Sequence, residues 1–226
     1  MSEKLIANGR VTVGGEVVTD PARDVDEGDD VRVDGGAVVA EGREVWAIHK
    51  PPGVVSTAKE PGSRPAVVSL VQSDARLYPV GRLDADSTGL LLLTNDGELA
   101  NRLTHPRYEV PKAYLVELAR RPSRVELDRL AAGVELEDGM TAPAEVGRRG
   151  ENRVEIVLRE GRNRQVRRMA EAVDNRVVAL RRVRFGPITL GDLREGEARP
   201  LTEDELTALR DLVPPSRRAG AKEATD

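Results

Sequence analysis

The chain contains no cysteine and only two histidines among its 226 residues. The lack of cysteine excludes disulfide bonds and thiolate metal sites, and it is typical of proteins from a reducing compartment. The two histidines, His49 and His105, lie far apart in the sequence. A histidine-rich metal centre is therefore not expected, and we predict no metal ligands.

Aromatic residues make up only 2% of the chain. The sequence also has no segment that is long and apolar enough to cross a membrane. The first ten residues, MSEKLIANGR, lack the apolar stretch of a secretory signal peptide. We therefore expect a cytoplasmic protein with no membrane partner. Hydrophobic residues make up 39% of the sequence, which is enough to build a folded core.

The net charge of −4 at first disfavours a nucleic-acid partner, but the charge is unevenly distributed. Residues 1–44 hold 11 acidic and 5 basic residues, a net charge of −6. Residues 159–184 hold nine arginines and three acidic residues, a net charge of +6. Because exposed charges are screened over about 10 Å, this arginine-rich segment acts locally and indicates a phosphate-binding surface. A solvated helix face is the alternative.

The sequence divides near residues 41–43. Before this point, short alternating valine segments separated by Gly and Asp turns are typical of small strands, and a new apolar strand begins at Val45. We predict a small module at residues 1–42 and a large domain at residues 43–213. The last residues, 214–226, are polar and are predicted to be a disordered tail.

Strands and helices alternate in the large domain. The run GLLLLTND is typical of a strand buried on both faces, and KAYLVEL of a strand with Tyr114, Val116 and Leu118 on one face. Helix starts are predicted where a capping residue precedes a glutamate by three positions, at Asn95 (with Asp96 as a rival cap), Ser123 and Thr202. After EGRNRQ, a further helix is predicted from the spacing of Val166, Met169, Ala170 and Val173. The fold class is α/β (α+β).

Three aspartates stand in the segment VGRLDADSTGLLLLTNDG, and one of them is a candidate for chemistry. Asp96 is explained as a helix cap. Asp84 precedes the buried leucine run, where a loop delivers a side chain to the edge of a rigid sheet, and a carboxylate held there can act as a nucleophile. From the residues alone, a turn aspartate with an ion pair is the favoured interpretation, because structural ion pairs outnumber catalytic ones.

Several motifs together resemble one family. HKPPGVVST, VGRLDADSTGLLLLTNDGELANRLTHP, KAYLVEL, EGRNRQVRRM and LRRVRFGPITL look like the successive motifs of the RsuA/RluB-type ribosomal RNA pseudouridine synthases. The resemblance implies a catalytic domain with a mixed, largely antiparallel sheet. It also implies that a uracil is detached from its ribose and rejoined through carbon, without a cofactor.

The resemblance implies a role for individual residues. Asp84 matches the family's catalytic aspartate, which is thought to act either on the anomeric carbon or on a sugar proton, and Asp86 falls at a variable turn position. Tyr114 matches a tyrosine that stacks on the target base, and Val166 matches an apolar neighbour of the uracil. Arg167 matches an arginine that pairs with the aspartate, and Arg82 matches a residue that fills the stack vacated by the flipped nucleotide. Contacts to RNA backbone phosphates are predicted for Arg162, Arg164 and Arg168. Lys50 is left open between a phosphate contact and a solvated side chain.

The N-terminus departs from the family pattern. SEKLIANGRVTVGGEVV resembles only the second helix and the strands of an S-four-like RNA-binding domain, so we predict a truncated module. We expect ribosomal RNA as the partner and a monomeric protein. The motifs LANRLTHP and GVELEDGM slightly favour the large-subunit 23S rRNA as the substrate. The alternatives are a non-catalytic RNA-binding or ribosome-assembly factor, which needs no cleft aspartate, and a glycosidase-like hydrolase, which needs a second carboxylate.

Overall fold

The computed structural model describes residues 2–26, 28–38, 42–58 and 64–214. The contacts divide the chain into two units, Met1–Gly42 and Arg43–Asp226. The predicted disordered tail falls outside the described residues except for Pro214.

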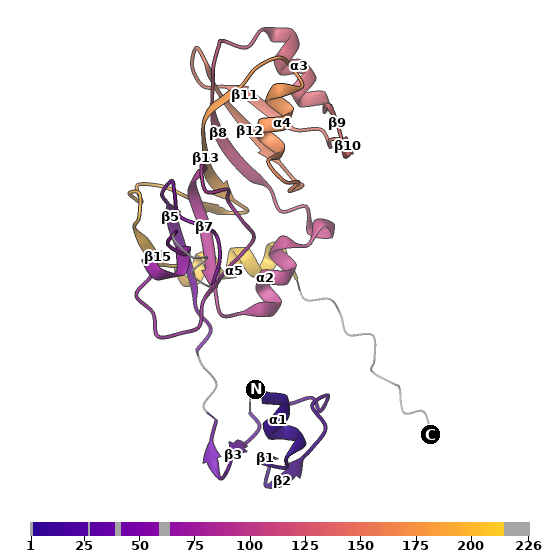
Figure 1. Ribbon diagram of the computed structural model, residues 1–226, viewed down its shortest axis with the longest axis vertical. Helices are drawn as coiled ribbons and strands as arrows, with labels where there is room; N and C mark the ends of the chain where they lie inside the picture. Colours follow the sequence, from indigo (N-terminus) through magenta and orange to yellow (C-terminus); the bar gives the residue numbers. More distant parts are fainter. Residues whose placement is uncertain (1, 27, 39–41, 59–63, 215–226) are drawn as a thin grey trace. The chain divides into compact units, whose positions relative to one another are not determined.

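The first unit contains one short helix and a four-stranded antiparallel sheet of order β2-β1-β3-β4 (Figure 1). Val11, Val13 and Val18 are buried in this unit. The burial of Val11 and Val13 agrees with the alternation of valines that predicted a strand there. The elements are α1 (Ser2–Ala7), β1 (Val11–Val13), β2 (Glu16–Val18), β3 (Val31–Val33) and β4 (Gly36–Ala37).

The second unit is built on a mixed, largely antiparallel sheet of order β11-β12-β8-β13-β7-β5-β15, which confirms the predicted fold class. Among the described pairings in this sheet, β13 with β7 is the one parallel pair. The strands are β5 (Val45–Lys50), β6 (Tyr78–Pro79), β7 (Thr88–Thr94), β8 (Lys112–Leu118), β11 (Glu145–Arg148), β12 (Arg153–Leu158), β13 (Val177–Phe185), β14 (Ile188–Thr189) and β15 (Ala198–Pro200), with a separate hairpin of β9 (Glu135–Leu136) and β10 (Gly139–Met140).

The helices of this unit begin largely where the capping residues predicted. Ser123 and Thr202 form complete capping boxes with the glutamates three residues on. Of the two rival caps of the first helix, Asp96 is the one used: its Oδ1 accepts from Leu99 N at 3.0 Å, whereas Asn95 Oδ1 accepts from Glu44 N. The helices are α2 (Gly97–Thr104), α3 (Arg124–Ala132), α4 (Gln165–Glu171) and α5 (Glu203–Leu212), with 3-10 turns η1 (Val67–Leu70) and η2 (Pro106–Tyr108).

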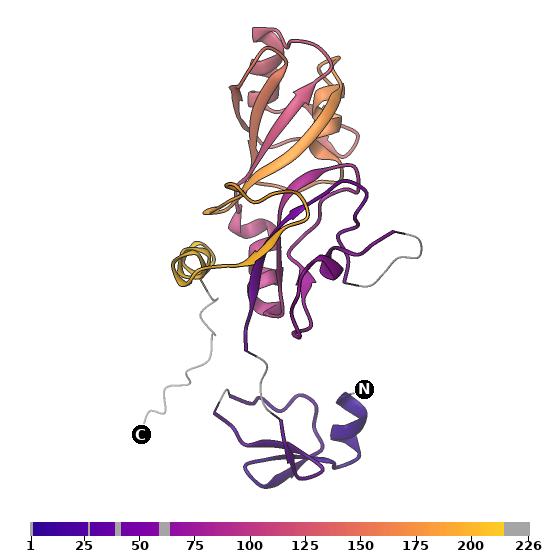
Figure 2. The same cartoon turned by 90° about the vertical axis from the view of Figure 1, so that its left-hand side faces the viewer.

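The sheet has two halves, each with its own helices (Figures 1 and 2). Helices α3 and α4 pack on β8, β12 and β13, with Val166 and Met169 buried there as the helical spacing predicted. Helices α2 and α5 pack on the β5–β7 half. The four leucines of β7 are fully buried and alternate between two clusters, so the strand is covered on both faces as predicted.

The two halves of the sheet meet where β7 runs beside β13. Gly89 pairs with Arg182, and a Cβ at Gly89 would lie only 2.2 Å from the carbonyl oxygen of Arg182. Because glycine has no Cβ and accepts a φ of +107°, only glycine allows this close approach. None of the helices within the described ranges combines the length and apolar character that crossing a bilayer requires.

Candidate active site

A cavity of about 620 Å³ lies in the second unit, where the two halves of the sheet meet. Its walls come from residues 81–87 before β7, residues 104–110 after α2, strand β8, residues 158–166 and strand β13. Of the residues singled out from the sequence, the cavity brings together Arg82, Asp84, Tyr114, Arg162, Arg164 and Val166. Arg167 and Arg168 are not part of its lining.

Asp84 stands on the cavity wall in a loop whose backbone is held by several hydrogen bonds, two of them with Ser56. Ser56 donates its hydroxyl to Leu83 O at 2.8 Å and accepts from Leu83 N at 3.0 Å. Both residues are buried, and Ser87 N donates to Asp84 O at 3.1 Å to close the turn. The backbone on both sides of Asp84 is therefore held, while its carboxylate remains 29% exposed.

The pairing of the arginines with the aspartates differs from the one predicted. Arg167 does not pair with Asp84: its Nη2 lies 3.1 Å from Asp86 Oδ2, and Arg164 Nη1 lies 3.7 Å from Asp84 Oδ2 and reaches Asp86 as well. Arg164, the residue before α4, has a left-handed backbone conformation with φ 47°, and its guanidinium contacts both aspartates from there.

Asp86 is thus more than an unpaired turn residue, since it binds two arginines. Asp86 and Arg164 are about half exposed, so their ion pair contributes little to stability. Arg167 differs, because its side chain is only 11% exposed and its buried Nε has no hydrogen-bond partner among the described residues.

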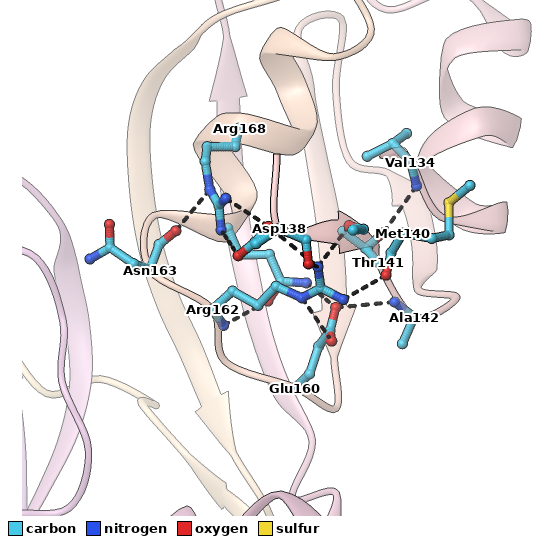
Figure 3. Close-up of polar contacts among 11 residues, drawn as sticks. Val134, Asp138, Met140, Thr141, Ala142, Glu160, Arg162, Asn163 and Arg168 are labelled. Atoms are coloured by element: carbon cyan, nitrogen blue, oxygen red, sulfur yellow. Dashed lines mark hydrogen bonds and ion pairs between the residues drawn. The ribbon is translucent and has the colours of Figure 1, made fainter. Parts of the chain in front are cut away.

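Arg162 and Arg168 both bind Asp138, in the turn between β9 and β10 (Figure 3). Arg168 contacts both carboxylate oxygens, at 2.9 and 3.0 Å, and its hydrogen bonds hold the pKa of Asp138 below its usual range. Arg162 also donates to Gly139 O at 2.7 Å and pairs with Glu160 at 3.3 Å. These contacts brace the segment that forms one cavity wall, and the phosphate contacts predicted for the two arginines remain predictions.

Tyr114 and Val166 lie where a planar base could contact them. Tyr114 is half-buried on β8, and Val166 is 4% exposed at the start of α4. Arg82 is exposed at the cavity rim, next to the buried Leu83. The cavity therefore combines a carboxylate, an aromatic side chain and an apolar side chain in a space of a size that suits small molecules.

Lys50 takes neither of the two roles left open for it. It is fully buried, and its Nζ donates to Pro51 O and Val54 O, both at 2.9 Å. Burial lowers the pKa of this ammonium to about 8, although the charges of Asp86 and Asp84 act in the opposite direction. Lys50 therefore holds the turn after β5 in place.

The sequence analysis missed several polar residues of the cavity, among them Ser87, Lys112 and Arg182. Ser87 is buried with no hydrogen-bond partner for its hydroxyl among the described residues, and Lys112 and Arg182 reach the cavity from β8 and β13. Burial, and secondarily the charge of Arg182, lowers the pKa of Lys112 to about 8. The two-residue period of the strand could have signalled Lys112, because it stands on the same face as Tyr114.

Comparisons with known proteins agree with this fold. The family model described as RNA pseudouridylate synthase matches residues 44–172, and the S4 domain model matches residues 1–31. A ribosomal large subunit pseudouridine synthase B from Bacillus subtilis is 40% identical over 225 residues, covering 96% of this chain and 92% of that protein. A ribosomal small subunit pseudouridine synthase A from Yersinia pestis is 40% identical over 206 residues, covering 88% and 87%.

A crystal structure of a pseudouridylate synthase shares the fold, with a TM-score of 0.71, 32% identity and 92% of each chain covered. The fold, the cavity and the extent of these matches define an RNA-modifying isomerase. The chain belongs to the RNA pseudouridylate synthase family, as its motifs indicated. It is an enzyme that isomerises uridine to pseudouridine in RNA, and it carries an S4 domain at its N-terminal end.

Proposed function

We propose that the protein converts a uridine of ribosomal RNA to pseudouridine, with Asp84 as the catalytic carboxylate. The observation that carries this proposal is the position of Asp84 on the cavity wall, in a loop held before Asp84 by the hydrogen bonds of Ser56 to Leu83 and after it by the hydrogen bond from Ser87 N to Asp84 O. A non-catalytic RNA-binding factor would have no need of so firmly held a carboxylate.

The choice of ribosomal RNA is supported by the relatives named for it. Both the large-subunit and the small-subunit synthases are 40% identical to the chain, and the large-subunit relative is covered more fully, at 96% against 88% of this chain. Together with the motifs LANRLTHP and GVELEDGM, this favours the large-subunit 23S rRNA. An rRNA substrate also agrees with the cytoplasmic location expected from the sequence.

The target nucleotide must leave its helix to reach Asp84, because the chemistry occurs at atoms that are covered in a stacked, paired base. In the proposed arrangement Tyr114 stacks on the flipped uracil, Val166 contacts its edge, and exposed Arg82 fills the vacated stack. A base stacked on an aromatic side chain gains about 1–3 kcal/mol. Asp84 then attacks the anomeric carbon or removes a sugar proton.

The arginines are proposed to divide into two groups. Arg164 is 46% exposed and can turn from Asp86 toward an RNA phosphate. Arg167 is nearly buried and has an unpartnered Nε, which suits a positioning role toward the aspartate loop when RNA is bound. Arg162 and Arg168 would contact phosphates from the braced segment beside the cavity. The protein is proposed to act as a monomer.

The proposal is tested by mapping pseudouridines in ribosomal RNA from cells with and without the gene. One site should disappear on deletion and return with the wild-type gene or with Asp96→Asn, which keeps a helix cap, but not with Asp84→Asn. An unchanged ribosomal map, or restoration by Asp84→Asn, would reject the substrate or the catalytic residue, respectively.

A further inference from the structure

Two cationic side chains in the cavity lack a carboxylate partner. Arg182 is 2% exposed; its Nε donates to Leu90 O at 2.7 Å, and its buried Nη2 has no partner among the described residues. Lys112 Nζ donates to Val110 O at 2.9 Å. Within the described ranges, neither side chain has an ion pair with an acidic residue.

The register of the sheet brings these two cations beside the tyrosine. In the β8–β13 ladder Arg182 is paired with Tyr114, and Phe185 with Lys112, so the two members of each pair share a face. An irregularity between Arg182 and Arg184 shifts the register by one residue, which places Arg182 and Phe185 on the same face. The Phe185 ring lies 5.2 Å from the Arg182 guanidinium and 5.8 Å from Lys112 Nζ.

Two like charges held near each other, one buried and the other half-buried, are costly unless an anionic or polar partner compensates for them. The lowered pKa of Lys112 reflects this cost. The cavity walls near the two cations include the apolar side chains of Val110, Leu180 and Phe185. Such walls suit a planar base better than a hydrated phosphate, which needs many polar contacts.

We propose that Lys112 and Arg182 donate hydrogen bonds to the carbonyl oxygens of the flipped uracil and stabilise the uracil anion formed when it leaves the ribose. This inference rests on the proposed function of the cavity. The C1′–N1 bond breaks with its electron pair passing to the uracil, where O2, O4 and N1 share the charge. The C5–C1′ bond then forms, and the proton lost from C5 is balanced by the one gained at N1.

The donors act on charge that develops during the reaction, so their removal should slow bond cleavage more than RNA binding. Loss of one preorganised donor to a developing anion reduces rates by about 10²–10³-fold. A substrate that stabilises its own anion should need the donors less. Fluorine at C5 of uracil withdraws electrons and makes the base a better leaving group.

The experiment measures single-turnover cleavage of the C1′–N1 bond at saturating RNA. The RNA is an rRNA fragment with either uridine or 5-fluorouridine at the mapped target. For Lys112→Met and Arg182→Gln, we expect a loss of about 10²-fold or more with uridine and a loss at least tenfold smaller with 5-fluorouridine. Arg181→Gln is the matched control, since Arg181 is exposed on the same strand, and it should keep the wild-type ratio between the two substrates.

Equal losses on both substrates, together with weaker binding and a salt slope reduced by about 1, would overturn the inference in favour of a phosphate site. Wild-type rates in both variants would also overturn it. If Arg182→Gln fails to fold, the partly exposed Lys112 still decides the question through Lys112→Met. Activity in Asp84→Asn would reject the proposed site itself, whereas an inactive Asp84→Asn beside fully active cation variants would reject this inference alone.

Discussion

Ser56→Ala should loosen the loop that carries Asp84 without changing a residue of the cavity lining. The serine hydroxyl satisfies both the N–H and the C=O of Leu83, at 3.0 and 2.8 Å, and both residues are at most 8% exposed. Removing the hydroxyl leaves two buried backbone groups without a partner, and each costs about 1–3 kcal/mol. We therefore expect the free energy of unfolding to fall by about 2–6 kcal/mol.

The same change should reduce turnover in the protein that remains folded. Asp84 follows Leu83 directly, and a displacement of about 1 Å at a reacting group can cost about 10²-fold in rate. Stability is measured by urea unfolding, and the rate by single turnover at saturating RNA, well below the unfolding midpoint. Ser56→Thr, which keeps the hydroxyl, should recover most of the rate.

Ser69→Ala is the matched control, because Ser69 donates only one hydrogen bond, to Ala66 O at 2.8 Å in the 3-10 turn η1. It should cost about 1 kcal/mol and leave the rate unchanged. The reasoning is refuted if Ser56→Ala matches Ser69→Ala in both stability and rate. A large loss of stability with a wild-type rate would show that Ser56 supports the fold but does not position Asp84.

Asp84→Asn should keep the fold and abolish pseudouridine formation in a tritium-release assay, whereas Asp96→Asn should stay active; turnover by a clean Asp84→Asn preparation would reject the assignment. Arg167→Ala should lower the single-turnover rate more than RNA affinity, and Arg164→Ala should mainly weaken binding and reduce the salt slope by about 1. Equal rate losses would contradict this division. Hydrogen bonds, the largest contribution coming from Arg120, lower the pKa of Glu126 from 4.5 to about 2. The ionised carboxylate therefore stabilises the folded state, and this stability is lost as the pH falls from about 4.5 to about 2. Glu126→Gln should flatten acid unfolding curves in that window, and an unchanged curve would count against the linkage.

Much of the fold could be predicted from local patterns. The capping boxes at Ser123 and Thr202, the buried leucine strand and the apolar face of α4 all follow from residue spacing. These patterns are reliable because they depend on neighbours within one element. The choice between Asn95 and Asp96 as the cap of α2 could not be made from the sequence, because a tertiary contact between Asn95 and Glu44 decides it.

The site was less predictable because it depends on long-range pairing. The sequence counts Arg182 and Arg164 alike within one basic segment, yet Arg182 is buried at a register shift and Arg164 is half exposed before α4. Neither the left-handed backbone of Arg164 nor the two ion pairs of Asp86 leaves a mark in the residue pattern. Side-chain partners among many arginines are set by geometry, not by spacing.

The parallel pairing of β7 with β13 also sets when the enzyme can first bind its substrate. Arg182 and Leu90, which this pairing joins by a hydrogen bond, are 92 residues apart in the chain. During synthesis from the N-terminus, the Asp84 loop and β7 are complete long before β13 leaves the ribosome. Until then the cavity lacks the wall formed by Leu180, Arg182 and Phe185. A nascent chain that already carries its S4 domain and Asp84 therefore cannot yet enclose a nucleotide in this cavity, and modification must wait until β13 has been made.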